Sequence, residues 1–150
     1  MIVTVRSDER LIHGKILNEW FREIEPSCLL IIDDELKNDI FMANVYLSLV
    51  PVSLDTQICS SNEAGEFISK KYKESDRIFI LSRTPKELLE LRKQNVMFYS
   101  ISVADKRYIS KKMEVTDLCK QAVNELLDIG VDIVYQVYPQ SDPVRIGKMQ

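Results

Sequence analysis

Short apolar runs alternate along the chain with stretches in which apolar residues recur at helical spacing. A short run rich in apolar and β-branched residues predicts a strand, and a continuous apolar run indicates a strand buried on both faces. Six runs fit this description, of which the third is the weakest: residues 2–5, 29–32, 56–59, 78–81, 96–101 and 131–137. Residues 109–115 are ambiguous, and one interpretation is a short edge strand kept soluble by Lys111 and Lys112.

Helical periodicity separates these runs. One helix is predicted from Gly14, and a second begins at the three acids of residues 33–35, where the helix dipole favours negative charge, and ends near Pro51. The residues expected on the inner faces of these two helices are Ile16, Leu17, Trp20, Phe21 and Ile24 in the first, and Leu36, Ile40, Ala43, Asn44 and Leu47 in the second.

Three further helices have clear start signals. Ser60 and Glu63 form a capping box, and Thr84-Pro85 supplies an N-cap with a proline at the first helical position. Thr116 is expected to cap the last helix, which Gly130 closes. The expected inner residues are Ala64, Phe67 and Ile68, then Leu88, Leu89 and Leu91, then Leu118, Ala122, Val123, Leu126 and Leu127.

Strands that alternate with helices predict a mostly parallel sheet covered on both faces. The expected fold is therefore an α/β protein, a three-layer α/β/α sandwich, with residues 1–150 forming a single domain. Pro139 and Pro143 make regular structure unexpected in the tail that follows the last predicted strand.

Composition narrows the classes of function. The net charge of −3 counts against a nucleic-acid partner, because phosphate binding needs concentrated positive charge. Cys28, Cys59 and Cys119 are scattered and odd in number, which predicts free, buried thiols in a reducing cytoplasm. The first ten residues lack the pattern of a signal peptide, and no apolar run approaches the roughly 20 residues of a membrane-spanning helix. A cytoplasmic protein is expected.

Glycine and histidine are scarce. The four glycines are isolated from one another, so neither a dinucleotide-binding turn nor a P-loop can be written. His13 is the single histidine, which excludes metal sites built from several imidazoles but leaves a site built from carboxylates alone open. No cofactor is expected.

Candidate chemistry concentrates in the loop of residues 6–13, after the first strand. Ligands of open α/β sheets bind beyond the carboxyl ends of strands. Arg6 and Arg10 offer forked donors that match phosphate oxygens, and a helix start follows His13. Asp8 is placed to hold one imidazole nitrogen as N–H and leave the other nucleophilic. These are the parts that a phosphohistidine needs.

Plainer interpretations stay open on these observations alone. The loop also fits a surface segment with offsetting charges and an inert histidine. Asp33 and Asp34 resemble the acidic pair of a receiver domain, but no aspartate ends the strand at residues 78–81, and helix-capping acids are the simpler interpretation. Ser82 and Thr84 end that strand and are candidates to line the cleft near His13, although capping alone explains Thr84.

The stretch Val5-Arg6-Ser7-Asp8-Glu9-Arg10-Leu11-Ile12-His13-Gly14, with Trp20 after it, closely resembles the enzyme IIB signature of the mannose/fructose/sorbose class. This class belongs to the bacterial sugar phosphotransferase system. Other segments also resemble the family: the strand that ends in acids at residues 31–35, the Thr84-Pro85 helix start, residues 109–112, and the last helix and strand. The resemblance covers nearly the whole chain.

The resemblance implies a phosphoryl carrier of the class protein-Nπ-phosphohistidine–sugar phosphotransferase. His13 would accept a phosphoryl group from a phosphohistidine on enzyme IIA and pass it to a sugar that the membrane components IIC and IID import. Arg10 would stabilise the phosphorylated loop, with Arg6 and Asp8 shaping it. Contacts to the phosphate loop or to partners are expected from Gly14, Lys15, Ser82, Thr84 and Asp34. The resemblance also suggests a homodimer, implies no metal, and places the protein in the cytoplasm against the membrane transporter.

Several positions depart from the family pattern. Lys15 stands where glutamine is usual, residues 99–103 lack the usual Asn-Val-Gly turn, and residues 51–53 lack the usual Pro-Gly turn. Two alternatives to the carrier therefore stay open. One is a regulatory, non-transporting protein of the same fold, and the other is a ligand-binding module of flavodoxin type with an inert histidine.

Overall fold

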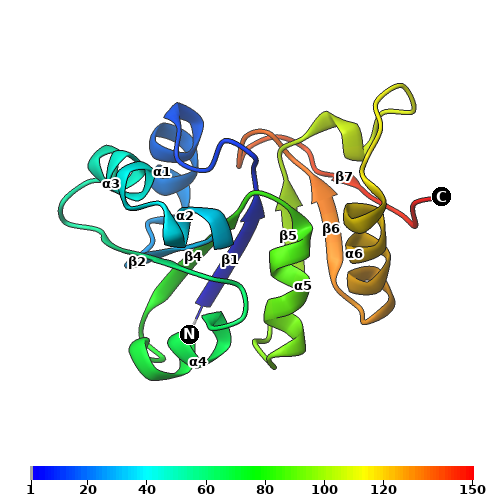
Figure 1. The fold of residues 1–150 in the computed structure, drawn as a ribbon. Coiled ribbons are helices and arrows are strands. Elements are labelled where there is room, and N and C mark those ends of the chain that lie inside the picture. Colours follow the sequence, from blue (N-terminus) through cyan, green and yellow to red (C-terminus); the bar gives the residue numbers. More distant parts are fainter. Residues whose placement is uncertain (1) are drawn as a thin grey trace.

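Seven strands form one sheet in the order β3-β2-β4-β1-β5-β6-β7 (Figure 1). The computed structural model describes residues 2–150. Six strands run parallel, and the last pairs antiparallel with β6. The strands are β1 (Ile2–Ser7), β2 (Cys28–Ile32), β3 (Asp55–Cys59), β4 (Arg77–Ser82), β5 (Ser100–Val103), β6 (Asp132–Tyr135) and β7 (Val144–Arg145).

Helices cover both faces of this sheet, which confirms the three-layer α/β/α prediction. They are the π-helix η1 (Ile16–Trp20), α1 (Phe21–Ile24), α2 (Asp34–Asn38), α3 (Ile40–Leu49), α4 (Ala64–Lys71), α5 (Pro85–Lys93), the 3₁₀ turn η2 (Lys106–Tyr108) and α6 (Asp117–Asp128). No helix among residues 2–150 is long and apolar enough to cross a membrane.

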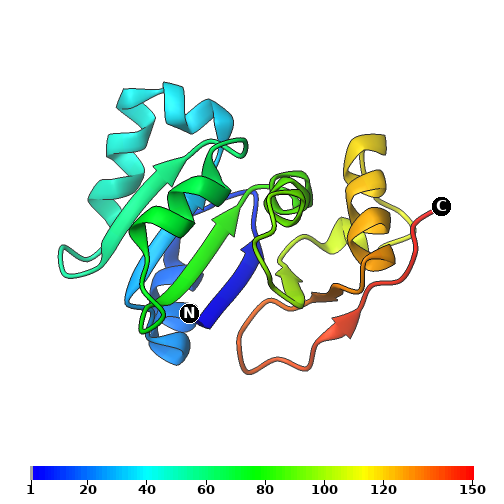
Figure 2. The same ribbon diagram turned by 90° about the horizontal axis from the view of Figure 1, so that it is seen from below.

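Alternate residues of the central strands separate into two cores. In β2, Leu30 and Ile32 face one core with α4, α5 and α6, while Leu29 and Ile31 face the other with η1 and α2. All five residues of β2 are buried, as the continuous apolar run predicted. Figure 2 shows α3 and the C-terminus at opposite ends of the sheet.

Several predicted boundaries are confirmed by their capping contacts. The Thr84 hydroxyl accepts from the backbone N–H of Lys86, and Pro85 opens α5. Thr116 caps α6 in the same way, and Gly130 follows that helix with a positive φ of 90°, a conformation that glycine adopts at little cost. The three cysteines are free and buried, as expected.

The single helix predicted for residues 33–51 is wrong. It is two helices, α2 and α3, because the Asp39 carboxylate accepts from the backbone N–H of Met42 and starts a new helix there. The break turns the second helix relative to the first. Ile40, predicted to face the core, is 76% exposed, and the predicted inner residue Leu47 is exposed as well.

Other predicted elements also need correction. Residues 96–99 lie outside β5, and the interpretation of residues 109–115 as an edge strand is wrong. Leu118 is 62% exposed rather than inner. The tail does contain a strand, contrary to the prediction. Pro143 lies just before β7, so its missing N–H removes no hydrogen bond between β7 and β6.

Candidate functional site

The candidate site lies where two neighbouring strands send the chain to opposite faces of the sheet. β1 leads to η1 on one face, and the adjacent β4 leads to α5 on the other. Such a divergence opens a crevice at the carboxyl ends of the strands. The two loops are joined there, because the backbone N–H of Asp8 donates to the Ser82 carbonyl over 2.8 Å.

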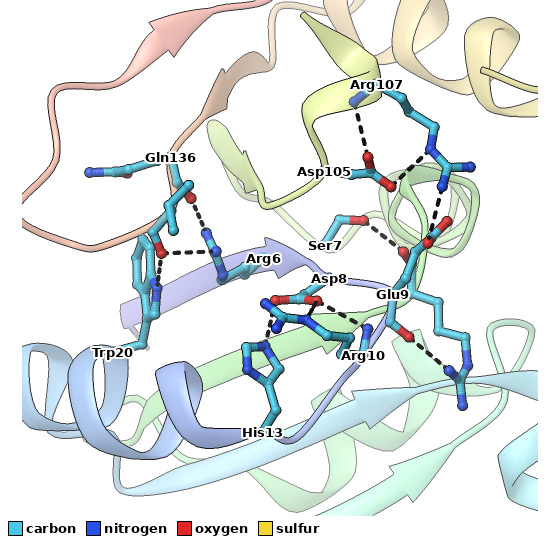
Figure 3. A network of polar contacts seen from close by, with 12 residues as sticks. Arg6, Ser7, Asp8, Glu9, Arg10, His13, Trp20, Asp105, Arg107 and Gln136 are labelled. Atoms are coloured by element: carbon cyan, nitrogen blue, oxygen red, sulfur yellow. Dashed lines mark hydrogen bonds and ion pairs between the residues drawn. The ribbon is translucent and has the colours of Figure 1, made fainter. Parts of the chain in front are cut away.

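Asp8 and His13 form the centre of this site (Figure 3). His13 Nε2 lies 2.7 Å from Asp8 Oδ2, and the Asp8 side chain is 3% exposed. A carboxylate accepts only, so in the neutral form of the ring Nε2 carries the proton and Nδ1 is unprotonated. The imidazole keeps 16% of its surface exposed, which leaves it within reach of a partner. The structure thus brings together the pair that the sequence predicted.

The loop that carries these residues is tightly wound. The second Asp8 oxygen accepts from the backbone N–H of Arg10 over 3.0 Å, and the N–H of Leu11 donates to the Asp8 carbonyl over 2.9 Å. Leu11 has a φ of 55°, a strained conformation for leucine. Its side chain is fully buried beside Ile12 and Ile16, so core packing holds the strained turn and fixes where His13 points.

Arg10 is the exposed cation of the site. Its side chain is 58% exposed, and its Nε lies 3.6 Å from Asp8 Oδ1, beyond hydrogen-bonding distance. The guanidinium is therefore free to turn toward an anion on His13. Figure 3 shows it on the same side of the loop as the imidazole.

Arg6, expected to donate to a phosphate, lies in a different environment. It is 1% exposed, and its Nη1 donates to Ser102 Oγ and to the Gln136 carbonyl over 3.1 and 2.8 Å. Its guanidinium also stacks 4.1 Å from the Trp20 ring. Burial lowers the pKa of Arg6 to about 10, which still leaves it charged at neutral pH. Direct phosphate binding by Arg6 is therefore not supported, and its contacts fix the segment after β6 against η1.

Replacing Arg6 with methionine is expected to lower the free energy of unfolding by about 3 kcal/mol, because the half-buried carbonyls of Gln136 and Val137 lose their charged donor. For a chain of this size, that corresponds to a fall in Tm of roughly 6–12 °C. Thermal unfolding followed by the fluorescence of the single tryptophan, Trp20, measures it. Arg22→Met, at an exposed position on α1, is the control and is expected to change stability by less than about 0.5 kcal/mol. Equal Tm values for both variants would contradict a structural role for Arg6.

Two arginines that the sequence analysis did not select brace the same loop. Arg83 Nη1 donates to the Glu9 carbonyl over 2.8 Å, and its Nε pairs with Asp33 over 2.6 Å. Arg107 Nη2 reaches the Glu9 carboxylate at 3.4 Å. The position of Arg83, directly after the strand beside β1, was the available signal for it.

The remaining predicted contact residues lie at different distances from this centre. Ser82 is buried and donates to the Thr84 carbonyl, while Thr84 bonds Glu87 and caps α5. Asp34 accepts from the backbone N–H and hydroxyl of Ser61, beyond β2 and β3. These contacts give all three side chains local structural roles.

Gly14 and Lys15 form the first turn of the helix after His13. A Cβ at Gly14 would meet nothing closer than 3.9 Å, so this glycine is not required for space. The Lys15 ammonium lies 5.1 Å from the centre of the Tyr138 ring. A cation in a first helical turn opposes the helix dipole, and Lys15 therefore favours an anion beside it.

The surroundings of the loop include both acidic and basic side chains. A hollow of about 260 Å³ adjoins it, lined by Asp8, Glu9, Arg10, Ala104, Asp105 and Lys106. Among residues 2–150, no group of three or more His, Cys, Asp or Glu side chains is placed to hold a metal ion. The free ring nitrogen, the exposed guanidinium and the helix start are suited to a covalently held phosphoryl group.

Fold and site together define an α/β domain that presents one carboxylate-bound imidazole at the carboxyl edge of a parallel sheet. Residues 2–148 match the family model described as "PTS system sorbose subfamily IIB component". The chain belongs to this family of IIB components of the sugar phosphotransferase system, as the resemblance indicated.

Relatives within the family differ in their sugars. The chain is 27% identical over 145 residues to the PTS system fructose-specific EIIB component of Bacillus subtilis, covering 92% of this chain and 88% of that protein. It is 25% identical over 154 residues to an N-acetylgalactosamine-specific enzyme IIB component of Escherichia coli, covering 99% and 98%. The crystal structure of the IIBSor domain of the Klebsiella pneumoniae sorbose permease superimposes with a TM-score of 0.85 at 21% identity, covering 96% and 93%. This last similarity concerns the fold.

Proposed function

We propose that this chain carries a phosphoryl group on His13 Nδ1, between the phosphohistidine of an enzyme IIA and a sugar bound to the membrane components IIC and IID. The observation that supports the choice of nitrogen is the contact of 2.7 Å between His13 Nε2 and Asp8 Oδ2. It commits the Nε2 lone pair to a proton and leaves the Nδ1 lone pair for phosphorus.

The transfer is an in-line displacement at phosphorus. The Nδ1 lone pair forms the new P–N bond as the P–N bond of the donor histidine breaks and its electron pair returns to the donor ring. In the second step a sugar hydroxyl forms a P–O bond, Nδ1 recovers its electron pair, and the hydroxyl proton passes to a base at the sugar site outside this chain. Asp8 stabilises the positive charge that the phosphorylated ring gains in between.

Arg10 supplies the charge that the phosphoryl oxygens need. Arg10→Ala is expected to leave the fold intact and to slow transfer from phosphorylated enzyme IIA by roughly 10²-fold, as for loss of a donor that stabilises transition-state charge. Arg10→Lys is expected to recover part of this loss, because an ammonium keeps the charge without the forked geometry. Rapid-quench measurements of transfer test this, and an unchanged rate in Arg10→Ala would remove Arg10 from the mechanism.

The carrier role itself is tested with phosphoenolpyruvate, the general phosphotransferase proteins and a matching enzyme IIA. Intact mass at mildly alkaline pH is expected to show the gain of one acid-labile phosphoryl group. No gain with an enzyme IIA that is active on another IIB component would contradict the proposal. NMR of the phosphorylated ring distinguishes the two nitrogens, and phosphorus on Nε2 would contradict the role given to Asp8.

A further inference from the structure

Helix α3 and the turn after it expose an apolar surface that the carrier function does not explain. Residues 40–54 include no charged side chain, in a chain of which 29% is charged. Ile40 and Phe41 are 76% and 75% exposed. The surface, called here the α3 surface, consists of Ile40, Phe41, Met42, Val45, Leu47, Leu49 and Val52.

The fold gives α3 only a narrow inner contact. Ala43 and Tyr46 pack against the core, while the apolar residues on the other sides face outward. Most residues of α3 are apolar, with Asn44 and Ser48 as the polar exceptions on its outer side. Exposed apolar residues that gather on one element mark an interaction site. Ten residues are too few to span a bilayer, so the partner has to cover the helix from outside.

The α3 surface is also connected to the His13 loop. Tyr46 lies 5.9 Å from the Arg83 guanidinium, which donates to the Glu9 carbonyl next to Asp8. Both α3 and η1 cover the same face of the sheet (Figure 1). A partner bound to α3 therefore lies on the same face of the sheet as η1, the helix that follows His13.

We propose that the α3 surface docks the cytoplasmic face of the membrane-embedded component that receives the phosphoryl group. This inference rests on the proposed carrier function and names where that component binds. The charges beside α3 select this partner: Glu35 and Asp39 are exposed there, and Lys37 in the same segment pairs with Glu63. Cytoplasmic loops of membrane proteins carry an excess of Lys and Arg, which complements an apolar surface with an acidic border.

The same charges disfavour two other partners. An anionic lipid surface repels an acidic border. A second copy of this chain would bring Asp39 close to the Asp39 of that copy if the two α3 helices paired in parallel. A membrane protein with basic cytoplasmic loops complements the acidic border and also covers the apolar surface.

The test compares the wild type with the double variant Ile40→Ser/Phe41→Ser. The probes are inverted vesicles from cells that produce IIC and IID, vesicles from cells without them, and protein-free liposomes of phosphatidylethanolamine and phosphatidylglycerol. The wild type is expected to bind only the first, and the double variant to bind it roughly tenfold or more weakly. Leu118→Ser/Ile129→Ser, at exposed apolar positions on and after α6, is the matched control and is expected to bind as the wild type does.

Four outcomes would overturn the inference, three in binding and one in phosphorylation. One is equal vesicle binding by the wild type and the double variant. The second is equal binding of the wild type to protein-free liposomes, which would identify a lipid-binding surface. The third is dimerisation of the wild type in sedimentation that the double variant loses, which would identify a second copy.

Phosphorylation by enzyme IIA in solution is measured separately and is expected to be the same in all variants. Its absence in the wild type contradicts the carrier function, whereas its loss in the double variant alone assigns the α3 surface to enzyme IIA and overturns the inference.

Discussion

His13→Ala is expected to abolish phosphoryl incorporation from enzyme IIA, down to the detection limit of intact-mass measurement. No other imidazole exists in the chain to accept the group. The proposed mechanism depends on this one ring, whose Nε2 contacts Asp8 and whose Nδ1 is the proposed acceptor. The helix start directly after it has no other imidazole beside it. Sugar phosphorylation in a reconstituted system is expected to be lost together with the incorporation.

The control for His13→Ala is the stability of the variant. The imidazole is only partly exposed, and its removal leaves the buried Asp8 Oδ2 without its donor. A loss of about 1–3 kcal/mol is therefore expected, more than for an ordinary surface change but not enough to unfold a typical domain. Circular dichroism and a cooperative thermal transition confirm the fold. An acid-labile phosphoryl group on folded His13→Ala would place the acceptor elsewhere and contradict the carrier mechanism.

The strands and helices that the sequence predicted well are those whose signals are local. Strand β2 is a continuous apolar run in the middle of the sheet, and α5 begins with a threonine cap and a proline. Both signals act within a few residues, so no tertiary contact is needed to interpret them. The order of the strands is different, because it is determined by pairings between distant segments.

The wrong predictions come from competing local or distant contacts. The apolar spacing of residues 33–51 suggested one helix, but the Asp39 cap divides it, and outward apolar residues of α3 were interpreted as core. Strand β7 forms only because β6 offers it an edge, which no pattern in the tail indicates.

The site shows the same division. Asp8 and His13 are five residues apart in one tight loop, so their contact could be predicted from the sequence. Arg6 is equally close to them along the chain, yet its long side chain binds carbonyls about 130 residues further along the chain. The direction of such a side chain depends on where the segment after β6 lies, and only the fold determines that.

Asp8→Asn is expected to slow phosphorylation of His13 by up to roughly 10⁴-fold, the loss found when a carboxylate that orients a catalytic imidazole becomes an amide. One Asp8 oxygen accepts from the backbone N–H of Arg10, and the other accepts from His13 Nε2. Asparagine has a single oxygen. If that oxygen keeps the Arg10 contact, its NH₂ group faces Nε2, and the ring proton moves to Nδ1, where it blocks the nucleophile. The rate of incorporation from phosphorylated enzyme IIA measures this effect.

The control for Asp8→Asn separates the tautomer from the folding of the loop. If the amide turns the other way, its NH₂ group opposes the backbone N–H of Arg10 and loosens the turn instead. NMR of the ring nitrogens is therefore recorded on the same variant, and the proton is expected on Nε2 in the wild type and on Nδ1 in Asp8→Asn. A wild-type rate with the proton on Nδ1 would contradict the assignment of Nδ1 as the nucleophile. A slowed rate with the proton still on Nε2 would assign the loss to the loop and remove tautomer control from the role of Asp8.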